Sequence, residues 1–175
     1  MDKYLLICAS AVAMAGAIHD ARSRRIPNRL TFTAIAAGLA VRAAVGGWLG
    51  LESAIWGALV AGGFFFLFFV VGGMGGGDVK LMAAVGAWAG IKQVTPILLA
   101  AALAGGVLAI VYMIADGSVG RTLRNSIVLL RHHLTFGLRP HPQINIQESG
   151  TTRVPFGIAI AVGTLFCAGS ALLRR

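Results

Sequence analysis

Long apolar runs separated by short polar connections dominate this chain of 175 residues. A helix that crosses the apolar core of a bilayer needs about 20 mostly apolar residues, and the chain has six candidate segments. The expected spans are Tyr4–His19, Leu30–Trp48, Ala54–Val71, Val79–Gly90, Pro96–Ala115 and Val154–Leu173. The fourth is short and follows a run of glycines, so we expect it to begin partway into the membrane. The pattern predicts an all-α polytopic membrane protein with about six transmembrane helices.

The composition agrees with a membrane protein and changes how the charge is interpreted. The chain is 57% hydrophobic and 12% charged, with a mean hydropathy of +0.82, whereas soluble domains carry roughly 25% charged residues. The formal net charge of +9 would favour nucleic-acid binding in a soluble protein. Here the basic residues lie between apolar runs, as in the loops of membrane proteins, so we expect no nucleic-acid partner.

The basic residues are divided unequally between the two sets of connections. One set holds ten, which are Arg22, Arg24, Arg25, Arg29, Lys80, Arg121, Arg124, Arg131, Arg139 and Arg153. The other set holds four, which are Lys3, Lys92, Arg174 and Arg175. Because positive charge collects on the cytoplasmic side, we expect the connections 20–29, 72–80 and 116–153 inside and the N-terminus outside.

The first apolar segment has two interpretations. Lys3, the apolar run and a small-residue site at Ala13–Ala15 are also found in cleaved signal peptides. However, Asp2 weakens the basic start, and the dense positive cluster follows the run instead of preceding it. We therefore favour a retained helix.

The connection 116–153 is the one part of the chain with a soluble character. Leucine and isoleucine recur at helical spacing at Leu123, Ile127, Leu130 and Leu134, among basic residues. This pattern is typical of an amphipathic helix on an anionic membrane surface, and a solvated basic loop is the alternative. His132, His133 and His141 lack a cysteine or carboxylate framework, and Cys8 and Cys167 form no CxxC pair. We therefore expect no metal site.

Six acidic residues are few enough to be judged one by one. They are Asp2 and Glu52 on the outer side, Glu148 in the long connection, and Asp20, Asp78 and Asp116 at cytoplasmic ends of spans. Ionisable residues at membrane depth are functional candidates. The pattern places Asp20 and Asp78 at the same membrane depth. Two carboxyls in contact share a proton, and such a pair can activate a water molecule and protonate a leaving amine.

Each of these three carboxylates also has a structural interpretation. Asp78 is placed to act as the N-cap of the following helix. Asp20 is close in sequence to Arg22 and Arg24, which are candidate ion-pair partners. Asp116 precedes Gly117, which suits a turn that ends a helix. The residues alone leave these alternatives open.

The glycines of 72–77 do not match the known phosphate-binding loops. A P-loop requires Lys and Ser or Thr after its last glycine, and here Asp78 and Val79 follow. The dinucleotide fingerprint fails because Asp78 stands where the third glycine belongs. Close helix packing through Gly72 and Gly76 remains open. Glycine permits positive φ and leaves space for a substrate backbone beside Asp78, so we expect a mobile, non-helical segment here.

Three segments resemble the type IV prepilin peptidases, which are GxGD-type intramembrane aspartyl proteases. They are "GMGGGDVKLM" around Asp78, "DARSRRIPNRLT" from Asp20, and "RVPFGIAIAVG" near the C-terminus. The resemblance implies a catalytic pair of Asp20 and Asp78 that cleaves a prepilin leader at the cytoplasmic face, typically after a glycine. The supporting motif residues that it implies are Pro27, Asn28, Gly75, Gly77, Lys80, Pro155 and Gly157. Lys80 is expected to bind an acidic substrate residue or the leader.

The chain departs from the larger members of that family. Those members carry an N-terminal domain with paired zinc-binding cysteines and also N-methylate the product, and no such cysteines are present here. Residues 1–175 therefore resemble the short, CpaA/TadV-like peptidases of tight-adherence (Flp) pilus systems. The resemblance implies one membrane peptidase domain that acts on Flp-type prepilins without cofactor, metal or methylation. A different preprotein substrate and a non-catalytic scaffold or small channel subunit are the alternatives, and the oligomeric state stays open.

Overall fold

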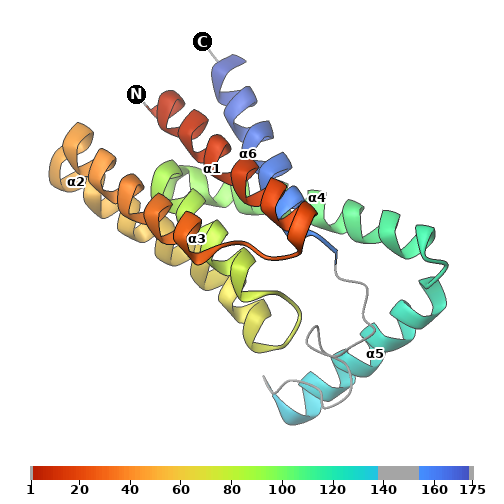
Figure 1. Cartoon of the computed structure of the whole chain (residues 1–175). Coiled ribbons are helices and arrows are strands. Elements are labelled where there is room, and N and C mark those ends of the chain that lie inside the picture. Colours follow the sequence, from red (N-terminus) through yellow and green to blue (C-terminus); the bar gives the residue numbers. More distant parts are fainter. Residues whose placement is uncertain (1, 138–153, 174–175) are drawn as a thin grey trace.

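The computed structural model describes residues 2–137 and 154–173, and these residues form helices joined by short connections (Figure 1). In chain order the helices are α1 (Asp2–Ser23), α2 (Asn28–Val70), α3 (Gly76–Ala89), α4 (Ile91–Ala115), α5 (Val119–Phe136) and α6 (Phe156–Leu173). No strand occurs in the described ranges. Four helices, α1, α2, α4 and α6, are long and apolar enough to cross a membrane. The prediction of an all-α polytopic membrane protein is confirmed.

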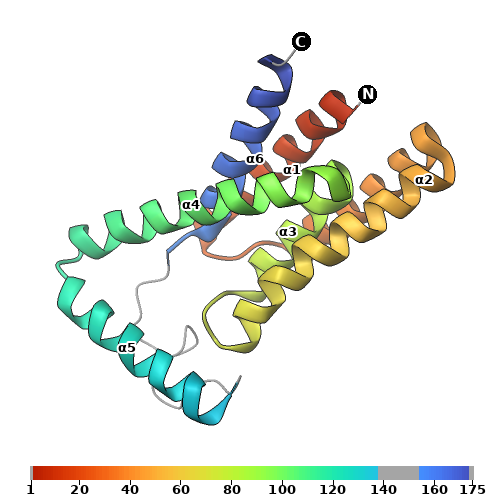
Figure 2. The same cartoon turned by 180° about the vertical axis from the view of Figure 1, so that it is seen from behind.

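The second and third expected spans are the two legs of α2. This helix has 43 residues, and at Gly47 its φ of 58° and ψ of −145° break the helical path. The two legs then run side by side, as both views show (Figures 1 and 2). Gly47 adopts a conformation that other residues rarely reach. At Gly50 a side chain would meet the Arg42 carbonyl group, so this turn requires glycine at both positions.

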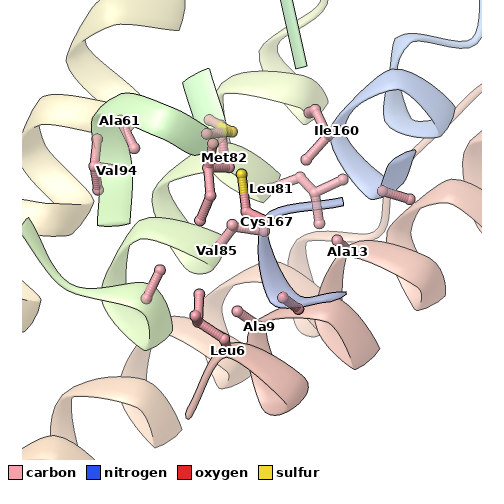
Figure 3. Packing of buried hydrophobic residues seen from close by; sticks show 14 of the residues in the cluster. Leu6, Ala9, Ala13, Ala61, Leu81, Met82, Val85, Val94, Ile160 and Cys167 are labelled. Carbon is pink, nitrogen blue, oxygen red and sulfur yellow. The ribbon is translucent and has the colours of Figure 1, made fainter. Parts of the chain in front are cut away.

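The fourth expected span corresponds to α3, which is too short to cross a bilayer. Its 14 residues extend about 21 Å at 1.5 Å per residue, against an apolar core of about 30 Å. Instead, α3 lies at the centre of the bundle, where Leu81, Met82 and Val85 are fully buried. Leu6 of α1 and Ile160 of α6 pack around them (Figure 3). The helix therefore belongs to the core.

The C-terminal end of α3 is held by the first leg of α2. The Arg42 side chain is buried, its Nε donates a hydrogen bond of 2.9 Å to the Trp88 carbonyl, and its Nη2 donates to the Ala89 carbonyl. Trp88 Nε1 donates a hydrogen bond of 2.9 Å to the Ala34 carbonyl. The last carbonyls of a helix lack partners within it and favour a nearby cation. This contact accounts for a charged residue within an apolar span.

The other end of α3 meets the end of α1 and the start of α6, while both chain termini lie at the opposite end of the bundle (Figure 1). Beyond α4, the helix α5 turns back and lies below the bundle, apart from the other helices (Figures 1 and 2). The helix expected from the spacing of Leu123 to Leu134 is thus confirmed. Its location on a membrane surface stays a prediction, and Arg139, His141, Glu148 and Arg153 lie outside the described residues.

Candidate active site

The first candidate carboxyl, Asp20, lies in the last turn of α1. Its backbone carbonyl accepts a hydrogen bond of 2.8 Å from the Arg24 N–H. Arg24 has a φ of 53°, in the left-handed region that often ends a helix. Asp20 is 8% exposed. The chain therefore buries this carboxyl just before the connection to α2.

The motif at the start of α6 contacts Asp20 directly. The Gly157 N–H donates a hydrogen bond of 2.8 Å to Asp20 Oδ2. This N–H lies in the first turn of α6, where backbone donors have no partner within the helix and favour a negative charge. A Cβ at position 157 would lie 3.0 Å from Asp20 Oδ2 and 3.0 Å from Asp20 Cβ. Glycine is therefore required for this approach, and the hydrogen bond favours an ionised Asp20.

The second candidate carboxyl, Asp78, lies in the first turn of α3. The N-cap of this helix is Gly75, and no side chain caps it, so the interpretation of Asp78 as the N-cap is wrong. A Cβ on Gly75 would lie 3.2 Å from Asp78 Oδ2, which means that the carboxyl folds back over the glycine backbone. Its Oδ1 is buried without a hydrogen-bond partner among the described residues. An ionised carboxylate is costly in such a place.

The surroundings of Asp78 favour its protonated form. The pKa of Asp78 is raised from 3.8 to about 7, mainly because the carboxyl is buried and also because of the charge of Asp20, while a hydrogen bond from the Gly75 backbone acts in the opposite direction. Two carboxyls that interact in this way bind one proton between them over a wide pH range. The arrangement therefore favours a proton on Asp78 up to about neutral pH.

Both carboxyls border a cavity of about 490 Å³. All of the helices except α5 contribute to its walls. The lining residues are Asp20, Arg24, Phe64, Phe65, Phe68, Gly73, Met74, Gly75, Asp78, Ala102, Gly105, Ala109, Val154 and Phe156. The third candidate carboxylate, Asp116, is exposed at the end of α4 and precedes Gly117, whose φ is 61°. The structure thus brings Asp20 and Asp78 together, and Asp116 ends a helix.

The glycine-rich segment is partly non-helical, and it fits against other parts of the chain. Helix α2 ends at Val70 and α3 begins at Gly76, with Gly72 at a φ of 79° between them. A Cβ at Gly77 would lie 3.2 Å from the Ile26 Cβ. The expected space beside Asp78 is therefore partly filled by the segment that follows Asp20. The expected mobility of this segment stays a prediction.

Lys80 connects two of the motifs. Its Nζ donates a hydrogen bond of 2.9 Å to Asn28 Oδ1 and lies 5.6 Å from the ring centroid of Phe32. Pro27 precedes this contact in an extended conformation, with φ of −64° and ψ of 135°, and serves as the N-cap of α2. These residues do not line the cavity. They hold the start of α2 against α3 and so position the turn that carries Asp78.

The expected motif residues therefore fall into two groups. Asp20, Asp78 and Gly75 line the cavity, whereas Gly77, Lys80, Asn28, Pro27, Pro155 and Gly157 do not. Of the second group, Gly157 contacts Asp20 directly. Sequence reasoning missed the aromatic and small residues of the cavity on α2 and α4. The run "FFFLFF" from Phe64 to Phe69 is the signal that points to them.

Possible metal ligands do not gather in the described ranges. No group of three or more His, Cys, Asp or Glu residues there is arranged to hold a metal ion. Cys8 and Cys167 are both free thiols. His132 belongs to α5, and His141 lies outside the described ranges.

Comparison with known proteins gives a consistent result. The model of the type IV leader peptidase family matches residues 5–110, which is more than half of the chain. A prepilin leader peptidase/N-methyltransferase of Xanthomonas campestris is 34% identical over 122 residues, which cover 65% of this chain and 41% of that protein. Proteins of the same name from Neisseria gonorrhoeae and Burkholderia pseudomallei are 36% and 33% identical, over 56% and 60% of this chain. No solved structure matches.

The fold and the site define a multi-pass helical membrane protein in which two carboxyls border one cavity. The family match supplies the particular assignment: the chain belongs to the type IV leader peptidase family. The matched part spans 41% of the length of the Xanthomonas protein, 36% of the Neisseria protein and 35% of the Burkholderia protein. Gly157 lies beyond the residues that the family model matches.

Proposed function

We propose that this protein is an aspartyl endopeptidase that removes the leader peptide of type IV prepilins, with Asp20 and Asp78 as the catalytic pair. The main support is one observation. Two carboxyls border the same apolar cavity, one accepting a backbone N–H and the other with a buried oxygen that has no hydrogen-bond partner among the described residues. Such an asymmetric pair suits peptide hydrolysis, which needs one group to accept a proton and another to donate one.

The reaction follows from this asymmetry. Ionised Asp20 takes a proton from a water molecule, whose oxygen attacks the carbonyl carbon of the scissile peptide bond, and Asp78 donates its proton to the carbonyl oxygen. The tetrahedral intermediate then collapses and the C–N bond breaks. The leaving nitrogen receives the proton from Asp20, and the hydroxyl proton of the intermediate returns to Asp78. One water is consumed, and the products are a carboxylic acid and an amine.

The proposal includes the membrane side and the substrate type. Ten basic residues lie in the connections on the side of Asp20 and Asp78, which supports a cytoplasmic active site in a bacterial inner membrane. The resemblance to the short peptidases of tight-adherence systems supports an Flp-type prepilin as substrate. On the same basis, residues 1–175 act as one peptidase domain that cleaves without methyl transfer. Mass spectrometry of the mature pilin should then find an unmethylated N-terminus.

The experiment is prepilin processing in membranes that contain this protein. Asp20→Asn and Asp78→Asn keep nearly the same shape and remove proton transfer, so each should abolish cleavage. Asp116→Asn is the matched control, because Asp116 lies outside the cavity. Processing that survives either of the first two substitutions would contradict the proposal. It would favour a non-catalytic scaffold or channel subunit, in which only geometry matters.

A further inference from the structure

The cavity continues from the two carboxyls along an aromatic wall on the second leg of α2. Phe64 and Phe68 both line it, with ring centroids 5.3 Å apart in an edge-to-face arrangement. They are 43% and 46% exposed, so the wall reaches the outer surface of the bundle. Behind them Phe65 is buried and packs edge-to-face on Phe156 at 5.7 Å. The exposed rings of Phe64 and Phe68 are therefore backed by a packed aromatic pair.

The opposite wall belongs to α4 and has almost no side-chain bulk. Ala102, Gly105 and Ala109 line the cavity, and their spacing of three and four residues places them on one face of the helix. The large neighbours Leu103 and Val107 do not line the cavity and are 73% and 63% exposed. The ring of Phe156 fills the space beside Gly105, where an added Cβ would collide with it. Ala102 and Ala109 are exposed, and small residues of this kind allow another backbone to approach closely in a membrane.

The two walls open away from each other. In both views α4 and the second leg of α2 diverge from the turn that joins α3 to α4 (Figures 1 and 2). The volume of about 490 Å³ lies within the range of roughly 300–1,000 Å³ for ligand sites. It holds a few apolar side chains and not a complete helix.

We propose that an apolar stretch of the substrate next to the scissile bond binds between Phe64 and Phe68 on one side and the exposed small residues Ala102 and Ala109 of α4 on the other. This inference rests on the proposed function. The wall is continuous with both carboxyls, so a segment held there places the adjoining peptide bond at Asp20 and Asp78. Aromatic faces provide a large apolar contact area, and the small face of α4 admits the substrate backbone.

Disulfide cross-linking tests the location without requiring cleavage. The chain carries Asp78→Asn together with Cys8→Ala and Cys167→Ala, and a prepilin carries one cysteine in its apolar segment. Ala102→Cys should cross-link to that prepilin at least about five times more than Leu103→Cys, the matched control on the neighbouring face. Equal cross-linking at the two positions would overturn the inference. Absence of cross-linking at Ala102→Cys, as expected if a lipid chain fills the cavity, would also overturn it.

Kinetics in the otherwise wild-type chain separate this inference from the proposed function. Phe64→Ala should raise the KM for the prepilin about tenfold, whereas Phe66→Ala should leave it within twofold. Phe66 is the matched control because it lies on the same leg, is 51% exposed and does not line the cavity. If the wild-type chain cleaves and both variants keep its KM, the inference fails alone. If the wild-type chain does not cleave any prepilin, the proposed function fails, and the cross-linking result decides the inference separately.

Discussion

The contact between Gly157 and Asp20 permits a quantitative prediction. Gly157→Ala adds a Cβ at 3.0 Å from both the Cβ and the Oδ2 of Asp20, and at 3.4 Å from the Ala17 Cα. Ordinary contacts of this kind lie at 3.4 Å or more. The Asp20 side chain must therefore move by several tenths of an ångström, or α6 must shift away from α1.

The expected effect is on the chemical step. A misplacement of about 1 Å in a catalytic group can cost about 100-fold in rate, and the shift here is somewhat smaller. The hydrogen bond from the Gly157 N–H to a charged acceptor contributes about 1.5–3 kcal/mol. Weakening it by half costs about 1 kcal/mol, or about fivefold. Together these effects predict a fall in kcat of about 10- to 100-fold. KM should stay nearly constant because Gly157 does not line the cavity.

The assay is the initial rate of prepilin cleavage by purified protein over a range of substrate concentrations. Gly169→Ala is the matched control, because it lies on the same helix and a Cβ there meets nothing within 4 Å. Thermal unfolding of each variant shows whether the fold is intact. If Gly157→Ala folds normally and keeps kcat within about threefold of the wild type, the reasoning about Asp20 is refuted.

Three further predictions concern the proton, the motif contact and the turn in α2. The pKa of Asp78 is raised to about 7 in the folded chain, from 3.8 in the unfolded chain. Between these two pH values the folded chain keeps a proton that the unfolded chain has lost. The resulting contribution to stability is complete below the unfolded pKa and is lost as the pH rises through about 7. The cleavage rate should fall over the same upper range, and a rate that stays constant from about pH 6 to about pH 8 would contradict a protonated Asp78. Lys80→Met removes the hydrogen bond to Asn28 and should lower the free energy of unfolding by about 1 kcal/mol, as measured by denaturation in detergent. The KM for the prepilin should stay unchanged. A raised KM would instead favour substrate binding by Lys80. Gly47→Ala forces alanine to a φ of 58° and should cost about 1–3 kcal/mol in the same measurement. Gly46→Ala is its control, and equal losses for the two would count against a strained turn.

Much of the fold and the identity of the candidate carboxyls can be predicted from the sequence. Hydropathy follows local composition, because each helix must satisfy its own backbone and present apolar side chains to lipid or core. The expected spans therefore coincide with α1, the two legs of α2, α4 and α6. With six acidic residues in the chain, their positions at span ends were enough to select Asp20, Asp78 and Asp116.

Some features are not encoded in any local pattern. The length of α3 and its central place follow from packing against its neighbours, since an apolar segment buried in protein and one facing lipid have similar composition. The roles of Lys80 and Arg42 also depend on partners far away in the chain: Lys80 binds Asn28, and Arg42 binds the end of α3. Hydropathy alone gives no information about such partners.

The sequence by itself determined that this is an all-α membrane protein, and it selected Asp20, Asp78 and the motif near the C-terminus as candidates. Only the tertiary structure decided which of them lie together. Gly157 and Asp20 are 137 positions apart, and their hydrogen bond exists because α6 packs against α1 closely enough to exclude a side chain. The glycines before Asp78 similarly make space for Ile26 and for the carboxyl itself. Contacts of this kind depend on the packing of whole helices, which the linear order of residues does not specify.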